Sequence, residues 1–156
     1  MTRHSRPLSH AMGLGALAGL IATLAMSAVM LVADRLGLMA EHPPERIVER
    51  GSKATGTPTS EGQQNALASA AHLAFGAAGG AGFGLLAQLV RPAIPGALAL
   101  PWALAIWAGS YFGWIPALGI LPPPTRDSPG RASTMLVAHL VYGLSLGVMW
   151  RAVTRR

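Results

Sequence analysis

Apolar residues fall into four long runs along the chain, and charged residues or prolines bound each run. The runs cover about residues 11–33, 66–90, 94–121 and 134–150. At a rise of 1.5 Å per residue, about twenty helical residues cross a hydrocarbon core roughly 30 Å thick. The pattern therefore predicts an all-α fold, a polytopic membrane protein with four transmembrane helices in a single membrane domain, residues 1–156.

The third and fourth runs depart from a simple span. The third contains Pro101 and Pro116, so we expect a kink or a late helix start there. The fourth is the shortest, and Arg151 at its end can extend its reach by snorkelling toward the membrane surface.

Residues 34–65 form the only sizeable polar loop. Pro43-Pro44 and the charged residues after them predict a short helix that Gly51 ends, followed by a flexible stretch to Gly62. Glu41, His42 and Glu45 could in principle bind a metal, but three neighbouring polar residues are more typical of a solvated surface, and we assign no metal site.

Composition agrees with a membrane protein. Hydrophobic residues make up 51% of the chain and charged residues 12%. Twelve Lys and Arg residues oppose six Asp and Glu residues, but the basic residues are scattered singly, which argues against nucleic-acid binding. Without cysteine, the chain has no disulfide or thiolate site. The Ala, Gly and Arg usage suggests a bacterial host, and therefore the inner membrane.

The N-terminal run has a second interpretation. Arg3 and Arg6 precede it, and the small residues Ala25–Ala28 resemble the cleavage region of a secretory signal peptide. Because the apolar run continues past that point to Ala33, we interpret it as a membrane helix.

A short pattern occurs twice. Residues 71–76, with the sequence AHLAFG, are followed by Gly80, and residues 138–143, with the sequence AHLVYG, are followed by Gly147. An apolar run that ends near a cluster of prolines precedes each copy. The chain therefore reads as two parallel helical-hairpin repeats related by an axis along the membrane normal, unless the similarity arose by chance in Ala- and Gly-rich segments.

Glycine recurs at helical spacing in both copies, as in a glycine zipper. Gly76, Gly80 and Gly84 share a helix face, and so do Gly143 and Gly147. Small residues let membrane helices approach closely, so we expect these glycines at helix contacts. The pairs Gly15 with Gly19 and Gly109 with Gly113 predict small-residue faces on the other two spans.

His72 and His139 occupy equivalent places in the two copies. An ionisable residue inside a span is costly and usually faces the bundle interior. Three roles stay open: a structural hydrogen bond to a neighbouring helix, a proton-responsive pair, and a ligand site.

Basic residues do not fix the orientation, because six lie on each side of a four-span topology. All six acidic residues lie on the loop side, whereas the arginines of the tails have no acidic neighbours. We therefore expect both termini in the cytoplasm.

The whole-chain layout resembles the YagU-like bacterial inner-membrane proteins. The resemblance rests on a small-residue first helix ending at a Pro-Pro loop and on residues 138–143. It implies an inner-membrane location and a part in acid tolerance, and it brings no catalytic residue or cofactor.

Three functions fit the sequence. The first is a non-catalytic structural or accessory protein, surrounded by membrane lipid and part of a homo-oligomer or a larger membrane assembly. The second is a proton- or solute-handling protein that uses His72 and His139. The third is an electron carrier whose histidines bind haem. No nucleophile, base and orienting group can be grouped from these residues, so we expect no enzyme and no catalytic residue.

Overall fold

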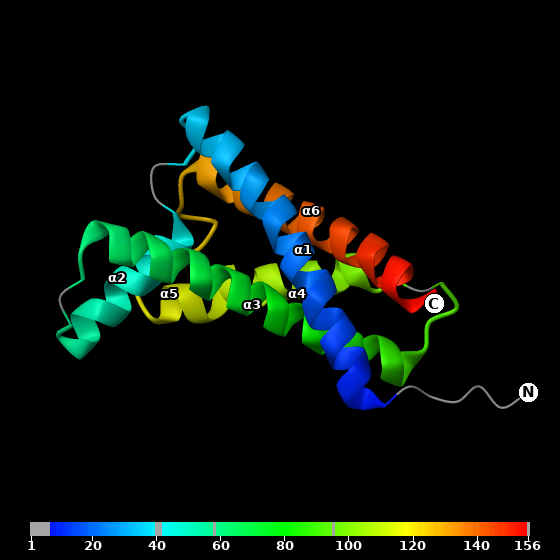
Figure 1. Ribbon diagram of the computed structural model, residues 1–156. Coiled ribbons are helices and arrows are strands. Elements are labelled where there is room, and N and C mark those ends of the chain that lie inside the picture. The colour runs from blue at the N-terminus through cyan, green and yellow to red at the C-terminus, as the bar shows by residue number, and fades with distance from the viewer. Residues whose placement is uncertain (1–6, 40–41, 58, 95, 156) are drawn as a thin grey trace, which may run out of the picture.

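The computed structural model describes residues 7–39, 42–57, 59–94 and 96–155, and their regular structure is helical (Figure 1). In chain order the elements are α1 Leu8–Arg35, α2 Pro43–Thr55, α3 Glu61–Val90, α4 Ala99–Ala108, the π-helix η1 Gly109–Trp114, α5 Ile115–Ala117 and α6 Pro129–Thr154. The all-α prediction is confirmed.

Three helices in the described part of the chain are long and apolar enough to cross a membrane, namely α1, α3 and α6. The chain is therefore a small multi-pass membrane protein. The predicted third span, 94–121, is not one long helix. It begins late, at Ala99, and is divided into α4, η1 and α5.

Local chemistry explains this division. Pro101 is tolerated because it lies in the first turn of α4, where its missing N–H leaves no hydrogen bond unmade. Gly113 has φ −104° and ψ −107°, outside the helical region, and Pro116 lacks an N–H donor in the next turn. The α-helical ladder is therefore interrupted where η1 lies.

The two neighbouring spans are longer than predicted because side-chain caps extend them. Ser60 and Gln63 form a reciprocal capping box, so α3 begins at Glu61 and not near residue 66. The Ser128 hydroxyl accepts the Arg131 N–H at 3.3 Å, so α6 begins at Pro129 and not near residue 134.

The prediction that Gly51 ends the short loop helix is wrong. Helix α2 continues to Thr55 and ends at Gly56, whose φ of 66° is the left-handed conformation that favours glycine. A glycine inside an exposed helix costs only about 1 kcal/mol. The Lys53 ammonium, 2.6 Å from Glu49, makes an ion pair that spans Gly51.

The helices cross and do not run as a parallel bundle. Helix α1 packs on both α3 and α6, and α4 packs on α6, whereas α3 and α4 share few contacts. Figure 1 shows the start of α1, the end of α6 and the turn after α3 at one end of the molecule, which we call the tail end. Helix α2 and the segment before α6 lie at the other end, which we call the loop end.

Candidate functional site

The crossing of α1 and α3 has no room for side chains. A Cβ atom placed on Gly80 would lie 2.7 Å from the Cα of Gly19, and one on Gly19 would lie 2.9 Å from the Cα of Gly80. A Cβ atom on Gly84 would lie 3.3 Å from the Cα of Gly15. The two backbones are therefore in contact, and they diverge from this point toward the loop end (Figure 1).

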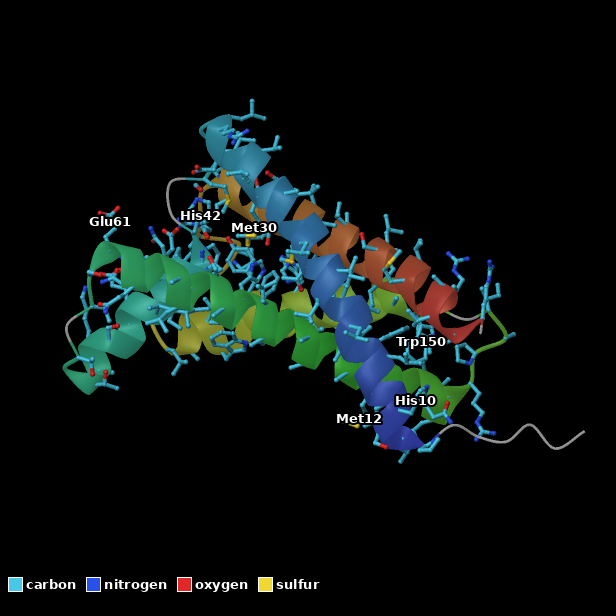
Figure 2. All side chains as sticks on the ribbon, in the orientation of Figure 1. His10, Met12, Met30, His42, Glu61 and Trp150 are labelled. Atoms are coloured by element: carbon cyan, nitrogen blue, oxygen red, sulfur yellow. The ribbon has the colours of Figure 1, made fainter. Side chains whose placement is uncertain are left out.

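A cavity of about 200 Å³ lies where the helices diverge. Its walls come from α1, α3, α4, η1, α5 and α6, and Pro43, Pro44 and Ile47 of α2 close it at the loop end. Met30, labelled in Figure 2, lines it from α1. The other thioethers of the wall are Met26 and Met135, and its aromatic rings are those of Phe75, Trp107, Tyr111, Trp114 and Tyr142.

The structure brings His72 and His139 to this one cavity, from α3 and α6 respectively. The sequence placed them in equivalent copies of a pattern, but it could not show that they share a cavity.

The two rings differ in their hydrogen bonds. Nδ1 of His139 lies 2.8 Å from the carbonyl oxygen of Met135. Since a carbonyl can only accept, Nδ1 carries the proton, and the Nε2 of the neutral ring is a free acceptor. Nδ1 of His72 lies 3.4 Å from the Ser27 hydroxyl, a pairing in which either atom can donate. Among the described residues, neither Nε2 has a hydrogen-bond partner.

Each predicted packing glycine of α3 and α6 lies against another helix. A Cβ atom on Gly76 would lie 2.9 Å from the Cβ of Thr23. One on Gly143 would lie 3.0 Å from the Cα of Leu100, and one on Gly147 would lie 3.3 Å from the Cβ of Ala99. Gly109 and Gly113 are different, because a Cβ atom on either would meet nothing within 4 Å in the described structure.

Two aromatic side chains tie α3 to the other helices through backbone carbonyls. The Tyr142 hydroxyl donates to the Gly76 carbonyl at 2.8 Å, and the Trp102 indole donates to the Gly79 carbonyl at 2.9 Å. These two hydrogen bonds link α3 to α6 and to α4, whereas α3 meets α1 through direct backbone contact. The spacing of the glycines indicated the small-residue contacts but gave no sign of these polar partners.

An ionic group at the loop end of the cavity was also missed. Nε of Arg131 lies 2.8 Å and 2.9 Å from the two carboxylate oxygens of Asp127, and the Tyr111 hydroxyl donates to the same carboxylate. The Asp127 side chain is fully buried. The group therefore ties η1, which lines the cavity, to the start of α6. The signal was an Asp and an Arg four residues apart across a Ser-Pro helix start.

Asp127 is ionised in this setting. Burial by itself opposes ionisation, but hydrogen bonds from Arg131, Tyr111 and the Ser128 backbone outweigh it, so the pKa of Asp127 lies below its ordinary value of 3.8. The carboxylate is therefore charged at neutral pH and compensates the buried Arg131.

One buried donor in the wall lacks a partner. In the described part of the chain, the Nε1–H of Trp107 is the sole buried side-chain nitrogen or oxygen atom without a hydrogen bond. A buried donor left unpaired costs about 1–3 kcal/mol.

The other polar residues considered from sequence lie outside this cavity. Nε2 of His42 is 3.1 Å from Asp34, and Glu41 is not among the described residues. Among the residues that are described, no three His, Asp or Glu side chains group closely enough to hold a metal ion.

The cavity does not fit haem. A cavity of about 150 Å³ is known to accommodate benzene, so one of about 200 Å³ holds a single substituted ring and not a four-ring macrocycle. We therefore assign no haem to the two histidines.

Comparison with known proteins gives one match. The model of a family of unknown function, DUF6789, matches residues 9–156. The YagU name is not confirmed by this match. No curated protein and no solved structure matches the chain.

Proposed function

The chain belongs to the DUF6789 family, which has no established activity, and from its geometry we propose that it is a non-enzymatic protein that binds a small apolar molecule inside the membrane. The cavity between the diverging helices carries this proposal. Its walls are mainly apolar and aromatic, and a few polar groups converge on it, as in small-molecule sites.

A brominated ring compound can test whether the cavity binds ligands. Bromine quenches tryptophan fluorescence on contact, and Trp107 and Trp114 both line the cavity. We expect 1-bromo-3-hexylbenzene to quench the purified protein saturably. Ser110 is a buried residue of the wall, so Ser110→Phe should fill the cavity and abolish the saturable component.

The matched control is Ala108→Phe, which adds the same ring at an exposed position of α4. It should bind the probe as the parent does. Quenching that rises linearly with probe concentration, equally in the parent and in Ser110→Phe, would reflect partition into detergent and would contradict the proposal.

A bacterial inner-membrane location with four spans is the second part of the proposal. Residues 99–117 run as α4, η1 and α5 in series with a kink at Gly113, and nineteen residues at a rise of 1.5 Å cover at most about 28 Å. With this fourth crossing the two tails share one side, which we propose is the cytoplasm. Alkaline phosphatase fused after residue 155 should then be inactive, and an active fusion would reverse the orientation.

The repeat model stays part of the proposal. In each hairpin the glycine face of the second helix meets the first helix, as Gly80 meets α1 and Gly143 meets α4. Because these faces are used within the chain, an accessory or homo-oligomeric role would need another surface. Gly13 and Gly109 have open space at the Cβ position and mark such surfaces on α1 and at the start of η1.

A proton-responsive histidine pair is the second candidate function. It is favoured by the placement of His72 and His139 on one cavity, where protonation of both would put two positive charges in apolar surroundings. The other titratable groups that line the cavity are Tyr111 and Tyr142, and the Asp127–Arg131 pair contacts Tyr111. Helix α2, which closes the cavity, carries Glu45, Arg46, Glu49, Arg50 and Lys53. The charge change would bias helix packing at the loop end.

Tryptophan fluorescence between about pH 7.5 and 4.5 tests the histidine pair. We expect a transition in the parent that is altered in His72→Gln and His139→Gln and lost when both are changed. A transition that persists unchanged in the double variant would exclude the pair as the sensor and leave the histidines a structural role.

A further inference from the structure

We propose that the cavity takes the head of a lipid-soluble phenol or quinol, a single ring whose hydroxyl donates a hydrogen bond to His139 Nε2. This inference rests on the proposed function, because it names the class of molecule that the cavity binds. Four features of the site support it: the cavity volume, the aromatic wall, the state of His139, and an exposed aromatic pair beside the cavity.

The volume sets the size of the bound group. At about 200 Å³ the cavity is somewhat larger than one that accommodates benzene, which leaves room for a ring with one or two small substituents. A longer apolar tail would have to extend outside it.

The wall favours an aromatic ring over a flexible chain. Aromatic side chains approach from α3, α4, η1 and α6, and three methionines supply polarisable sulfur, which packs well at ring edges. An acyl chain could fill the same volume, but it would leave the polar groups of the wall without partners.

Those polar groups call for a hydroxyl. Because Nδ1 of His139 donates to Met135, Nε2 of the neutral ring can only accept, and a hydroxyl can donate to it. A ketone oxygen could not.

An exposed aromatic pair offers a way out for the tail. Phe75 and Trp114 line the cavity, yet they are 48% and 36% exposed on the outside of the protein. Their ring centroids are 6.3 Å apart, and they bridge α3 and η1. Since the backbones of α3 and η1 make few close contacts, side chains alone close this side of the cavity.

The test compares two probes that differ by one hydroxyl, 2-bromo-4-hexylphenol and 1-bromo-3-hexylbenzene, by tryptophan quenching of the full chain in detergent. After correction for partition into empty micelles, the phenol should bind the parent more tightly. His139→Phe should weaken phenol binding about three- to tenfold, the loss expected for one neutral hydrogen bond, and leave the bromobenzene unchanged. His139→Gln retains an acceptor oxygen and should bind nearly as the parent does.

The outcomes separate this inference from the proposed function. Saturable quenching by both probes, with equal affinity in the parent and no effect of His139→Phe, would overturn hydroxyl recognition and leave an apolar binding site. Equal binding of 10-bromodecan-1-ol would overturn recognition of the ring. No saturable quenching by any probe would overturn the proposed function itself. The comparison of probes in the parent needs no variant, so it decides the matter even if His139→Phe does not fold.

Discussion

Where α1 crosses α3, the two backbones touch, whereas at the loop end the same helices are separated by side chains, α2 and a cavity. The crossing is built from glycine and small residues such as Ala11, whose backbone lies against Gly84 and which is buried. The loop end is built from methionines, aromatic rings and one ionic group. Close contact at one point of two straight helices forces separation farther along, so the glycines that stabilise the crossing also create the cavity.

The two regions should therefore respond differently to substitution. At the crossing an added side chain meets backbone, which cannot rotate away. At the loop end an added side chain meets flexible methionines or empty volume, and stability depends instead on the buried ionic group.

The largest effect is expected at the crossing. Gly80→Leu would drive a side chain into the Gly15 carbonyl and the Gly19 backbone, so we expect a loss of at least about 3 kcal/mol and a low yield of folded protein. Size-exclusion profiles and thermal unfolding in detergent measure this. Gly13→Leu is the control, since a Cβ atom there meets nothing within 4 Å. Equal stability of the two variants would show that the backbones do not touch.

A smaller loss is expected from the ionic group. Asp127→Ala leaves the buried Arg131 without its carboxylate, and breaking such a pair costs about 3 kcal/mol of stability. Water at the membrane surface that solvates Arg131 would reduce this cost. Thermal unfolding in detergent should show the loss. Asp127→Asn keeps the shape of the side chain and one acceptor, so it should lose less stability. Unchanged stability of both variants would show that the ionic group does not stabilise the loop end.

The same group predicts an acid limit. Because the pKa of Asp127 is lowered in the folded protein, its ionised form contributes stability that is fully present above the ordinary value of 3.8. This stability is lost as pH falls below about 4 and through the lowered pKa. Stability curves of the parent and Asp127→Ala should converge in that range. If the difference in stability between the parent and Asp127→Ala stays constant as the pH falls through this range, the Asp127 carboxylate is not the source of that difference.

The smallest effect is expected on the surface of α2. Glu49 pairs with Arg46 and Lys53 on one exposed turn, and ion pairs of this kind contribute little. Glu49→Gln should leave thermal unfolding of the whole protein almost unchanged. A large drop in the unfolding temperature would mean that these ion pairs of α2 stabilise the whole protein.

The hydrophobic pattern determined the membrane class and the places of the three long helices, because a span of this length has few other solutions in lipid. The ends of the helices were harder to predict from the sequence. The caps at Ser60 and Ser128 lengthened two helices, and α2 passed through Gly51, a position that the Glu49–Lys53 ion pair spans. A cap is worth about 1 kcal/mol and an exposed ion pair less, and an apolar pattern reveals neither.

Spacing along the chain singled out His72, His139 and the glycines, since residues four apart share a helix face. Only the tertiary structure decided what each face meets. It placed Gly80 against backbone and left Gly109 against open space. It also joined Asp127 to Tyr111, sixteen residues earlier in the chain. A cavity depends on the angle at which helices cross, and that angle arises from contacts between distant segments that no local pattern encodes.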